Sequence, residues 1–102
     1  MKKLLLILLA LPMIGFGQNV NIPDANFKAY LVGNTSINTN GDTEIQVSEA
    51  SVFNGAIDCN SMSISDLTGI EDFTALAELN CDVNQLTTLD VSNNLALTYL
   101  DC

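Results

Sequence analysis

Hydrophobic and polar positions repeat along the second half of the chain with a period in the low twenties. Three short stretches share one order of apolar, polar and cysteine positions: IDC at 57–59, LNC at 79–81 and LDC at 100–102. Their cysteines are spaced by 22 and then 21 residues. A fixed period of this length is typical of solenoids, in which each coil buries its apolar face against the next one. The pattern therefore predicts an α/β solenoid.

Each of these stretches is expected to form a short strand, because apolar and polar residues alternate in it with period two. Leu79 and Cys81 would point into the core, and Asn84 would turn inward and satisfy backbone groups along the stack. The polar residues between them would face outward on a concave sheet. These candidate recognition residues are Asp58, Asn60, Glu78, Asn80, Asp82, Tyr99 and Asp101.

The three cysteines allow three interpretations. Metal binding or nucleophilic catalysis would need a C-x-x-C pair, a histidine or another base, and the chain contains no histidine. Disulfides can form outside the cell, and strands of one sheet lie about 4.8 Å apart. Side chains that point in parallel nevertheless suit a disulfide poorly. We therefore expect Cys59, Cys81 and Cys102 to form one column of buried free thiols, with disulfides as the alternative.

Residues 18–56 precede the repeats and predict a short helical N-terminal cap. In IPDANFKAYLVGN, Asp24 is a candidate N-cap, Phe27, Tyr30 and Leu31 share one helix face, and Gly33 is a stop signal. A second short helix is expected in SEASVF, with Ser48 as its cap. Such a cap would cover the apolar edge of the first coil.

The loop between these two helices matches part of a calcium-binding pattern. Counted from residue 38, it places oxygen-bearing or carboxylate side chains at the spacing of an EF-hand loop and an apolar residue at position 8. The candidate ligands are Asn38, Asn40, Asp42, Glu44, Gln46 and Glu49. Position 1 is Asn instead of Asp, and position 6 is Thr43 instead of glycine. The alternatives are a calcium site, the only cofactor indicated, or an ordinary polar loop of the cap.

The first 17 residues have the layout of a cleaved signal peptide. Two lysines precede an apolar stretch from Leu4 to Phe16, and small residues follow at Gly15 and Gly17. This stretch has 13 residues, whereas a membrane-spanning helix needs roughly 20. We therefore expect a secreted or cell-surface protein that is not inserted in the membrane after cleavage.

The charge of the remaining chain narrows the choice of partner. After removal of residues 1–17, one basic residue, Lys28, stands against twelve acidic residues, so the net charge is −11. Such a surface repels the phosphates of nucleic acids and anionic membranes, and nucleic acid is excluded as a partner. Cations, basic proteins and neutral glycans stay compatible with it.

The stretch ISDLTGIEDFTALAELNCDVNQLTTLDVSNN resembles the repeats of internalin-like, secreted bacterial leucine-rich repeat proteins, and LDVSNN resembles cell-surface proteins of the Bacteroidetes. The resemblance covers residues 57–102 and implies leucine-rich repeat coils that bind a protein or glycan on their concave face, without enzymatic activity. The repeats break off at Cys102 midway through a coil, so we expect a fragment of a longer array. The alternative is a targeting or adhesion arm of a larger surface protein or enzyme, with or without dependence on calcium.

Overall fold

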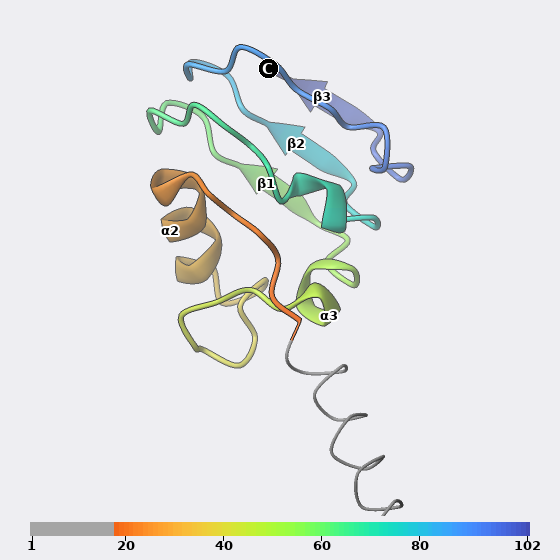
Figure 1. The fold of residues 1–102 in the computed structure, drawn as a ribbon. Helices are drawn as coiled ribbons and strands as arrows, with labels where there is room; N and C mark the ends of the chain where they lie inside the picture. The colour runs from red at the N-terminus through yellow and green to blue at the C-terminus, as the bar shows by residue number, and fades with distance from the viewer. Residues whose placement is uncertain (1–17) are drawn as a thin grey trace, which may run out of the picture.

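The fold is a small, open, parallel β-sheet that follows two short helices. The computed structural model describes residues 18–102, so the expected signal peptide lies outside the described residues. The strands are β1 (Ala56–Asp58), β2 (Glu78–Asn80) and β3 (Tyr99–Asp101), and they lie side by side in sequence order (Figure 1). Within residues 18–102, no helix has the length and apolar character needed to cross a membrane.

The strands pair in the register that the repeat predicts. Ile57, Leu79 and Leu100 lie opposite one another, as do the residues on either side of them. Ile57 and Leu79 are fully buried, whereas Leu100 on the edge strand β3 is 45 % exposed. The pairing continues past the strand ends, because the N–H of Cys59 donates to the carbonyl of Asn80 at 2.8 Å. The alternation of inward and outward side chains is confirmed for β1 and β2, whereas all residues of β3 are exposed.

The first helix, α2 (Ala25–Gly33), begins where the sequence predicts. The carboxylate of Asp24 accepts hydrogen bonds from the N–H groups of Asn26 and Phe27, both at 3.0 Å, and so caps the helix. Its other oxygen accepts from the N–H groups of Ser65 and Asp66 at 2.9 and 3.2 Å. One side chain thus both starts the helix and attaches it to the connection between β1 and β2.

The second helix, α3 (Val47–Ala50), begins earlier than the sequence analysis placed it. Its N-cap is Gln46, so the prediction of Ser48 was wrong. Gln46 and Glu49 form a reciprocal capping box, in which the Glu49 carboxylate accepts from the N–H of Gln46 at 3.0 Å. The pairing of Val47 N–H with the carbonyl of Gln18, at 3.0 Å, fixes the start of the helix from outside.

The core is continuous from the helices to β2. Phe27, Leu31, Ile57, Phe73 and Leu79 have no exposed surface. They belong to one apolar cluster. The helical segment therefore shares the core of the sheet and covers its β1 side (Figure 1).

Two asparagines join successive repeats through buried backbone groups. The Oδ1 atom of Asn84 accepts from the N–H groups of Met62 and Ile64 at 3.0 and 2.9 Å, and its Nδ2 donates to the carbonyls of Cys59 and Cys81 at 2.9 and 3.0 Å. The predicted inward orientation of Asn84 is confirmed. On the return side, Asn94 Nδ2 donates to the carbonyls of Ile70 and Phe73 at 2.8 and 3.0 Å, whereas its Oδ1 has no partner among the described residues.

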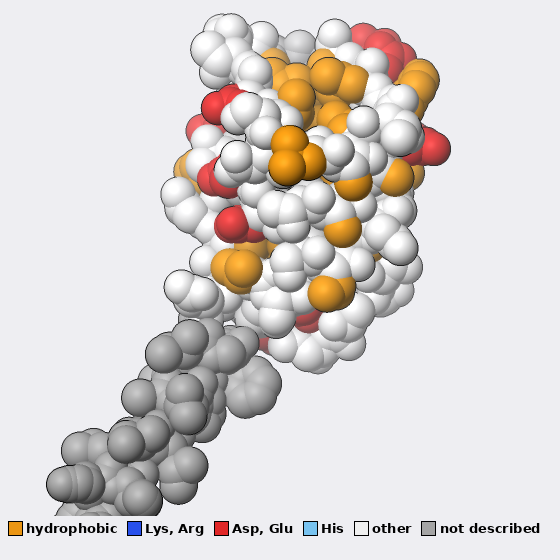
Figure 2. Space-filling model, turned by 90° about the vertical axis from the view of Figure 1, so that its right-hand side faces the viewer, with side chains coloured by type: hydrophobic (Ala, Val, Ile, Leu, Met, Phe, Trp, Pro, Cys, Tyr) orange, Lys and Arg blue, Asp and Glu red, His pale blue; other side chains and the backbone are white. Residues whose placement is uncertain are grey.

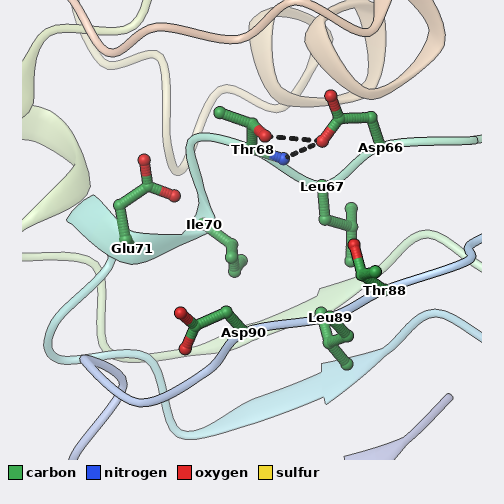
Figure 3. A pocket seen from close by; sticks show the side chains of 8 residues that line it. All are labelled: Asp66, Leu67, Thr68, Ile70, Glu71, Thr88, Leu89 and Asp90. Carbon is green, nitrogen blue, oxygen red and sulfur yellow. Dashed lines mark hydrogen bonds between the residues drawn. The ribbon is translucent and has the colours of Figure 1, made fainter.

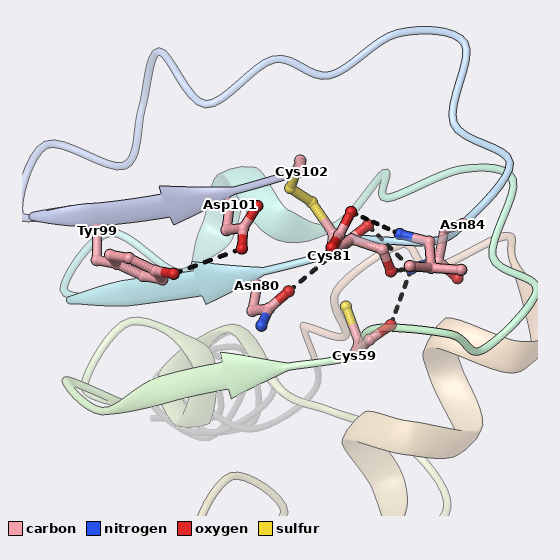
Figure 4. Close-up of a disulfide and its surroundings, with 9 residues drawn as sticks. Cys59, Asn80, Cys81, Asn84, Tyr99, Asp101 and Cys102 are labelled. Atoms are coloured by element: carbon pink, nitrogen blue, oxygen red, sulfur yellow. Dashed lines mark hydrogen bonds between the residues drawn. A yellow bond between two sulfur atoms is a disulfide. The ribbon is translucent and has the colours of Figure 1, made fainter.

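The cysteines differ from the expected column of buried free thiols. Cys59 is buried and free, but Cys81 and Cys102 form a disulfide (Figure 4). The Cα atoms of this pair are 4.6 Å apart, which lies within the range that disulfides span. The spacing of neighbouring strands therefore permits the bond even though the side chains point in parallel. The expectation of free thiols at Cys81 and Cys102 was wrong. Cys102 is also exposed, because it follows the edge strand β3.

Candidate functional site

The seven predicted recognition residues lie along one face of the sheet, which we call the outer sheet face. The strand register sets Ala56, Glu78 and Tyr99 in one row. Asp58, Asn80 and Asp101 form the next row, two residues further along each strand. Asn60 and Asp82 lie two residues after the last residue of β1 and of β2. The structure therefore places all seven residues, and also Ala56, close to one another.

Hydrogen bonds along each strand order these side chains. The amide of Asn60 donates to the Asp58 carboxylate, and the N–H of Asp82 donates to Asn80 Oδ1 at 3.1 Å. The Tyr99 hydroxyl lies 3.4 Å from Asp101 Oδ2 (Figure 4). Such bonds within the face limit the freedom of its polar groups, so less ordering is needed when a ligand binds.

The outer sheet face carries four carboxylates and no basic side chain. Lys28 is the only basic residue in the described part of the chain, and its Nζ lies 2.9 Å from Glu44 in the helical segment. The negative charge of Asp101 is the main reason why the pKa of Tyr99 is raised, and Glu78 and Asp82 add to the effect. Their fields therefore converge at the Tyr99 ring, which is half exposed.

Two residues of this face escaped the sequence analysis. Ala56 occupies the position of Glu78 one repeat earlier, and the period could have revealed it. Tyr30 packs against the core, as predicted from its helix face, and its hydroxyl in addition accepts from the N–H of Asp58 at 3.1 Å. It therefore terminates the free edge of β1, and no signal in the sequence indicates this contact.

The six candidate calcium ligands lie in one loop, but they do not all converge. Glu44 pairs with Lys28, and Asn38 is buried, donating from Nδ2 to the carbonyls of Val32 and Asp42 at 3.0 and 2.7 Å. Within the described residues, no three carboxylate, imidazole or thiol groups gather closely enough to hold a metal ion.

The remaining four candidates share a hydrogen-bond network. Asp42 Oδ2 accepts from the amides of Asn40 and Gln46 at 3.2 and 3.0 Å. Glu49 Oε2 accepts from the N–H of Asn40 and from the hydroxyl of Thr39, both at 3.1 Å. Asn40 Oδ1 and Asp42 Oδ1 accept from the N–H groups two residues on, as in ordinary Asx turns. Asn38 Oδ1 is buried without a hydrogen-bond partner among the described residues.

A small hollow lies between the connecting segments of the two repeats. Its volume is about 110 Å³, and its lining includes Asp66, Glu71 and Asp90 (Figure 3). The hydroxyl and N–H of Thr68 hold Asp66 at 2.6 and 2.8 Å, and those of Ser92 hold Asp90 at 2.6 and 2.9 Å. These bonds lower the pKa of both carboxyls. The same turn thus recurs in both repeats, and Asp66 and Asp90 have a structural role in it.

The chain is similar in sequence and in fold to an internalin. No known family model matches the chain. A segment of 39 residues is 51 % identical to Internalin J of Listeria monocytogenes serotype 4b, strain F2365. This segment amounts to 38 % of the present chain and 4 % of Internalin J.

The fold is similar to that of the functional domain of InlJ from Listeria monocytogenes, a structure described as including a cysteine ladder. The TM-score is 0.66 at 38 % identity, over 83 % of this chain and 19 % of the InlJ chain. A structure of the CBM51-2 and INT domains of Clostridium perfringens ZmpB matches at 26 % identity and a TM-score of 0.58, over 80 % of this chain and 17 % of its own. The same domains with CBM51-2 bound to GlcNAc match with a TM-score of 0.59, over 81 % and 17 % of the two chains. The present chain thus spans less than a fifth of these proteins.

Proposed function

We propose that this chain is an internalin-like binding module of an exported protein, and that it recognises a protein or a glycan through the outer sheet face. In this proposal the strands belong to a leucine-rich repeat solenoid and the face is concave. Residues 1–17 would direct export and leave the protein secreted or at the cell surface. The similarity to InlJ supports the binding role.

The observation that carries the proposal is the composition of the outer sheet face. Its rows combine carboxylates, amides and the half-exposed ring of Tyr99 on a surface of paired strands. A rigid sheet that presents polar side chains in fixed register is suited to recognition, because little order must be gained on binding. The face contains no histidine, the commonest general base, and we expect it to bind without catalysis.

A steric substitution tests the position of the binding surface. Residues 18–102 would be screened against glycans, including GlcNAc, and against purified cell-surface proteins. We expect Ala56→Trp to abolish any binding found, because it adds bulk to the first row of the face without changing charge. Asn93→Trp is the matched control, since Asn93 is exposed in the connection that leads to β3. Equal binding by wild type and Ala56→Trp would contradict the proposal.

The module can also serve a larger protein as its targeting or adhesion arm. The lengths of the similar proteins favour this second reading, because the chain matches only 4 % of Internalin J. A catalytic domain elsewhere in such a protein would use the module to reach its substrate. Fusing residues 18–102 to an unrelated reporter enzyme and measuring its retention on ligand-coated beads tests the role. Retention that survives Ala56→Trp would argue against it.

Calcium is a second candidate ligand, and it would act in the loop of residues 38–49. The buried Oδ1 of Asn38, which has no hydrogen-bond partner among the described residues, supports this candidate. A bound ion would take oxygens from Asn38, Asn40, Asp42 and Glu49, and it would stiffen the segment between α2 and α3. In the present structure, the side-chain amides of Asn40 and Gln46 donate hydrogen bonds to Asp42 Oδ2.

Calorimetric titration of residues 18–102 with Ca²⁺ tests this candidate. We expect a saturable heat and a higher melting temperature, because an ion that binds only the folded state stabilises it. Asp42→Asn with Glu49→Gln keeps oxygen acceptors but removes two charges, and it is expected to abolish both effects. Asp66→Asn with Asp90→Asn removes two charges elsewhere and serves as the control. The absence of a heat would leave the loop with a purely structural role.

A further inference from the structure

The outer sheet face has a strong charge imbalance that nothing in the described chain neutralises. Asp58, Glu78, Asp82 and Asp101 lie on it, and the only basic side chain of residues 18–102 is engaged by Glu44 at 2.9 Å. The face is also open to solvent, because its four carboxylate residues and Tyr99 are all exposed. A positively charged ligand would therefore supply the charge that the described chain does not provide here.

A neutral ligand would be at a disadvantage on this surface. Covering a carboxylate removes water from it, and the cost is recovered only if an opposite charge or several hydrogen-bond donors replace the water. A glycan offers hydroxyl donors but no charge. A polypeptide with basic side chains offers both, and attraction by the face would also raise its rate of association.

Tyr99 favours arginine among the basic side chains. Its ring is 50 % exposed and shares a row with Glu78, while Asp101 is the next outward residue of the same strand. A guanidinium group can stack on an aromatic ring and at the same time donate two parallel hydrogen bonds to a carboxylate. A lysine ammonium can also lie over an aromatic ring, but it lacks the planar fork that donates two parallel hydrogen bonds to a carboxylate.

We propose that the outer sheet face binds an arginine-bearing polypeptide segment, with one guanidinium stacked on Tyr99 and paired with Glu78 or Asp101. This inference rests on the proposed function, since it names the ligand class of the same face. Neighbouring basic side chains of the segment would meet Asp58 and Asp82 in the adjacent rows.

Binding of synthetic peptides tests the proposal directly. The probe is a fluorescent peptide of alternating arginine and glycine, compared with the matching lysine and glutamate peptides by anisotropy at low and physiological salt. The arginine peptide is expected to bind best, the glutamate peptide not at all, and salt is expected to weaken binding. We expect Glu78→Gln with Asp101→Asn to weaken binding roughly tenfold, from two partly exposed charge pairs.

Two controls separate a specific site from general attraction. Asp66→Asn with Asp90→Asn removes the same charge from the connecting segments and is expected to change affinity by less than about twofold. Tyr99→Ala is expected to cost about three- to fivefold through the lost stacking, whereas Tyr99→Phe keeps the ring and the affinity. Equal losses in the two charge variants, or no loss in Tyr99→Ala, would overturn the proposal.

The steric variant distinguishes this inference from the function on which it rests. If Ala56→Trp blocks binding of a glycan or protein while the arginine peptide fails to bind, the outer sheet face is the recognition surface and the cationic ligand class is wrong. If the peptide binds and Ala56→Trp leaves its affinity unchanged, the peptide lies elsewhere and the inference fails. Loss of peptide binding in Ala56→Trp, with Asn93→Trp unaffected, supports both.

Discussion

At the scale of single residues, Asn84 is expected to matter most for stability. Its side chain satisfies backbone groups of both repeats, including the N–H groups of Met62 and Ile64. Asn84→Ala would leave these groups without partners in a partly buried place, so we expect the free energy of unfolding to fall by about 2–4 kcal/mol. Urea denaturation measures it. Asn93→Ala is the control and should change stability little, and a similar loss in both variants would contradict the assigned role.

Asp24 couples the first helix to the repeats and makes that coupling depend on pH. Burial alone would raise the pKa of Asp24, but hydrogen bonds from the N–H groups of Ser65, Phe27, Asn26 and Asp66 outweigh it and lower the pKa below 3.8. A carboxylate with a lowered pKa in the folded state stabilises the fold above its ordinary pKa, and this contribution is lost as the pH falls through the lowered value.

Asp24→Asn tests this coupling. The amide keeps an acceptor oxygen but loses the charge and the second pair of bonds, so we expect the free energy of unfolding to fall by about 1–2 kcal/mol at neutral pH. The difference between wild type and variant should be constant above about pH 5 and shrink below 3.8. Melting curves from acid to neutral pH measure it, and a difference that persists unchanged at low pH would argue against the charge as its cause.

At the scale of elements, the cysteines that follow the three strands differ in their chemical state. Cys81 and Cys102 tie the ends of β2 and β3 covalently, whereas Cys59 stays free beneath β1. Burial, helped by the negative charge of Asp58, raises the pKa of Cys59 to about 11. Because the thiolate is the reactive form, this thiol is expected to be nearly inert in the folded protein.

Thiol titration of residues 18–102 tests this arrangement. We expect almost no reaction in the native protein, one thiol after unfolding without reductant, and three after unfolding and reduction. Reduction alone should lower the free energy of unfolding by about 3 kcal/mol, the effect of a cross-link that closes a loop of 21 residues. Three thiols in the unreduced, unfolded protein would show that the ladder of cysteines is not cross-linked.

The elements also show which features the sequence could reveal. Period-two alternation and the 21- to 22-residue repeat predicted the strands, their register and the inward turn of Asn84, because these are local patterns that recur. The cap of α3 was missed because Gln46 is placed by its pairing with Asn19, a contact between distant residues. The bond of Tyr30 to β1 and the disulfide depend likewise on distances that only the folded chain defines.

At the scale of the whole molecule, the two edges of the sheet differ in whether other parts of the described chain cover them. Tyr30 and the helices close the β1 side, whereas hydrophobic side chains gather toward the end of the molecule where β3 lies (Figure 2). Leu95 is 88 % exposed there and Leu100 is 45 % exposed. A groove of about 430 Å³ is lined by the Cys81–Cys102 disulfide and by residues of the connection after β2. The N–H groups of Asn84 and Leu86 find no acceptor within residues 18–102, although their counterparts in the first repeat bind Asn84.

This open side predicts that residues 18–102 associate with one another when studied alone. Burying the exposed leucines and pairing the free edge of β3 favours contact between copies. Leu95→Lys adds charge to the open side and is expected to shift the protein toward monomer in sedimentation velocity over a concentration series. Val52→Lys is the matched control, because Val52 is 72 % exposed but lies just after α3, away from β3. If Val52→Lys disperses the protein equally, the loss of an exposed apolar side chain anywhere on the surface, and not the open side, governs its association.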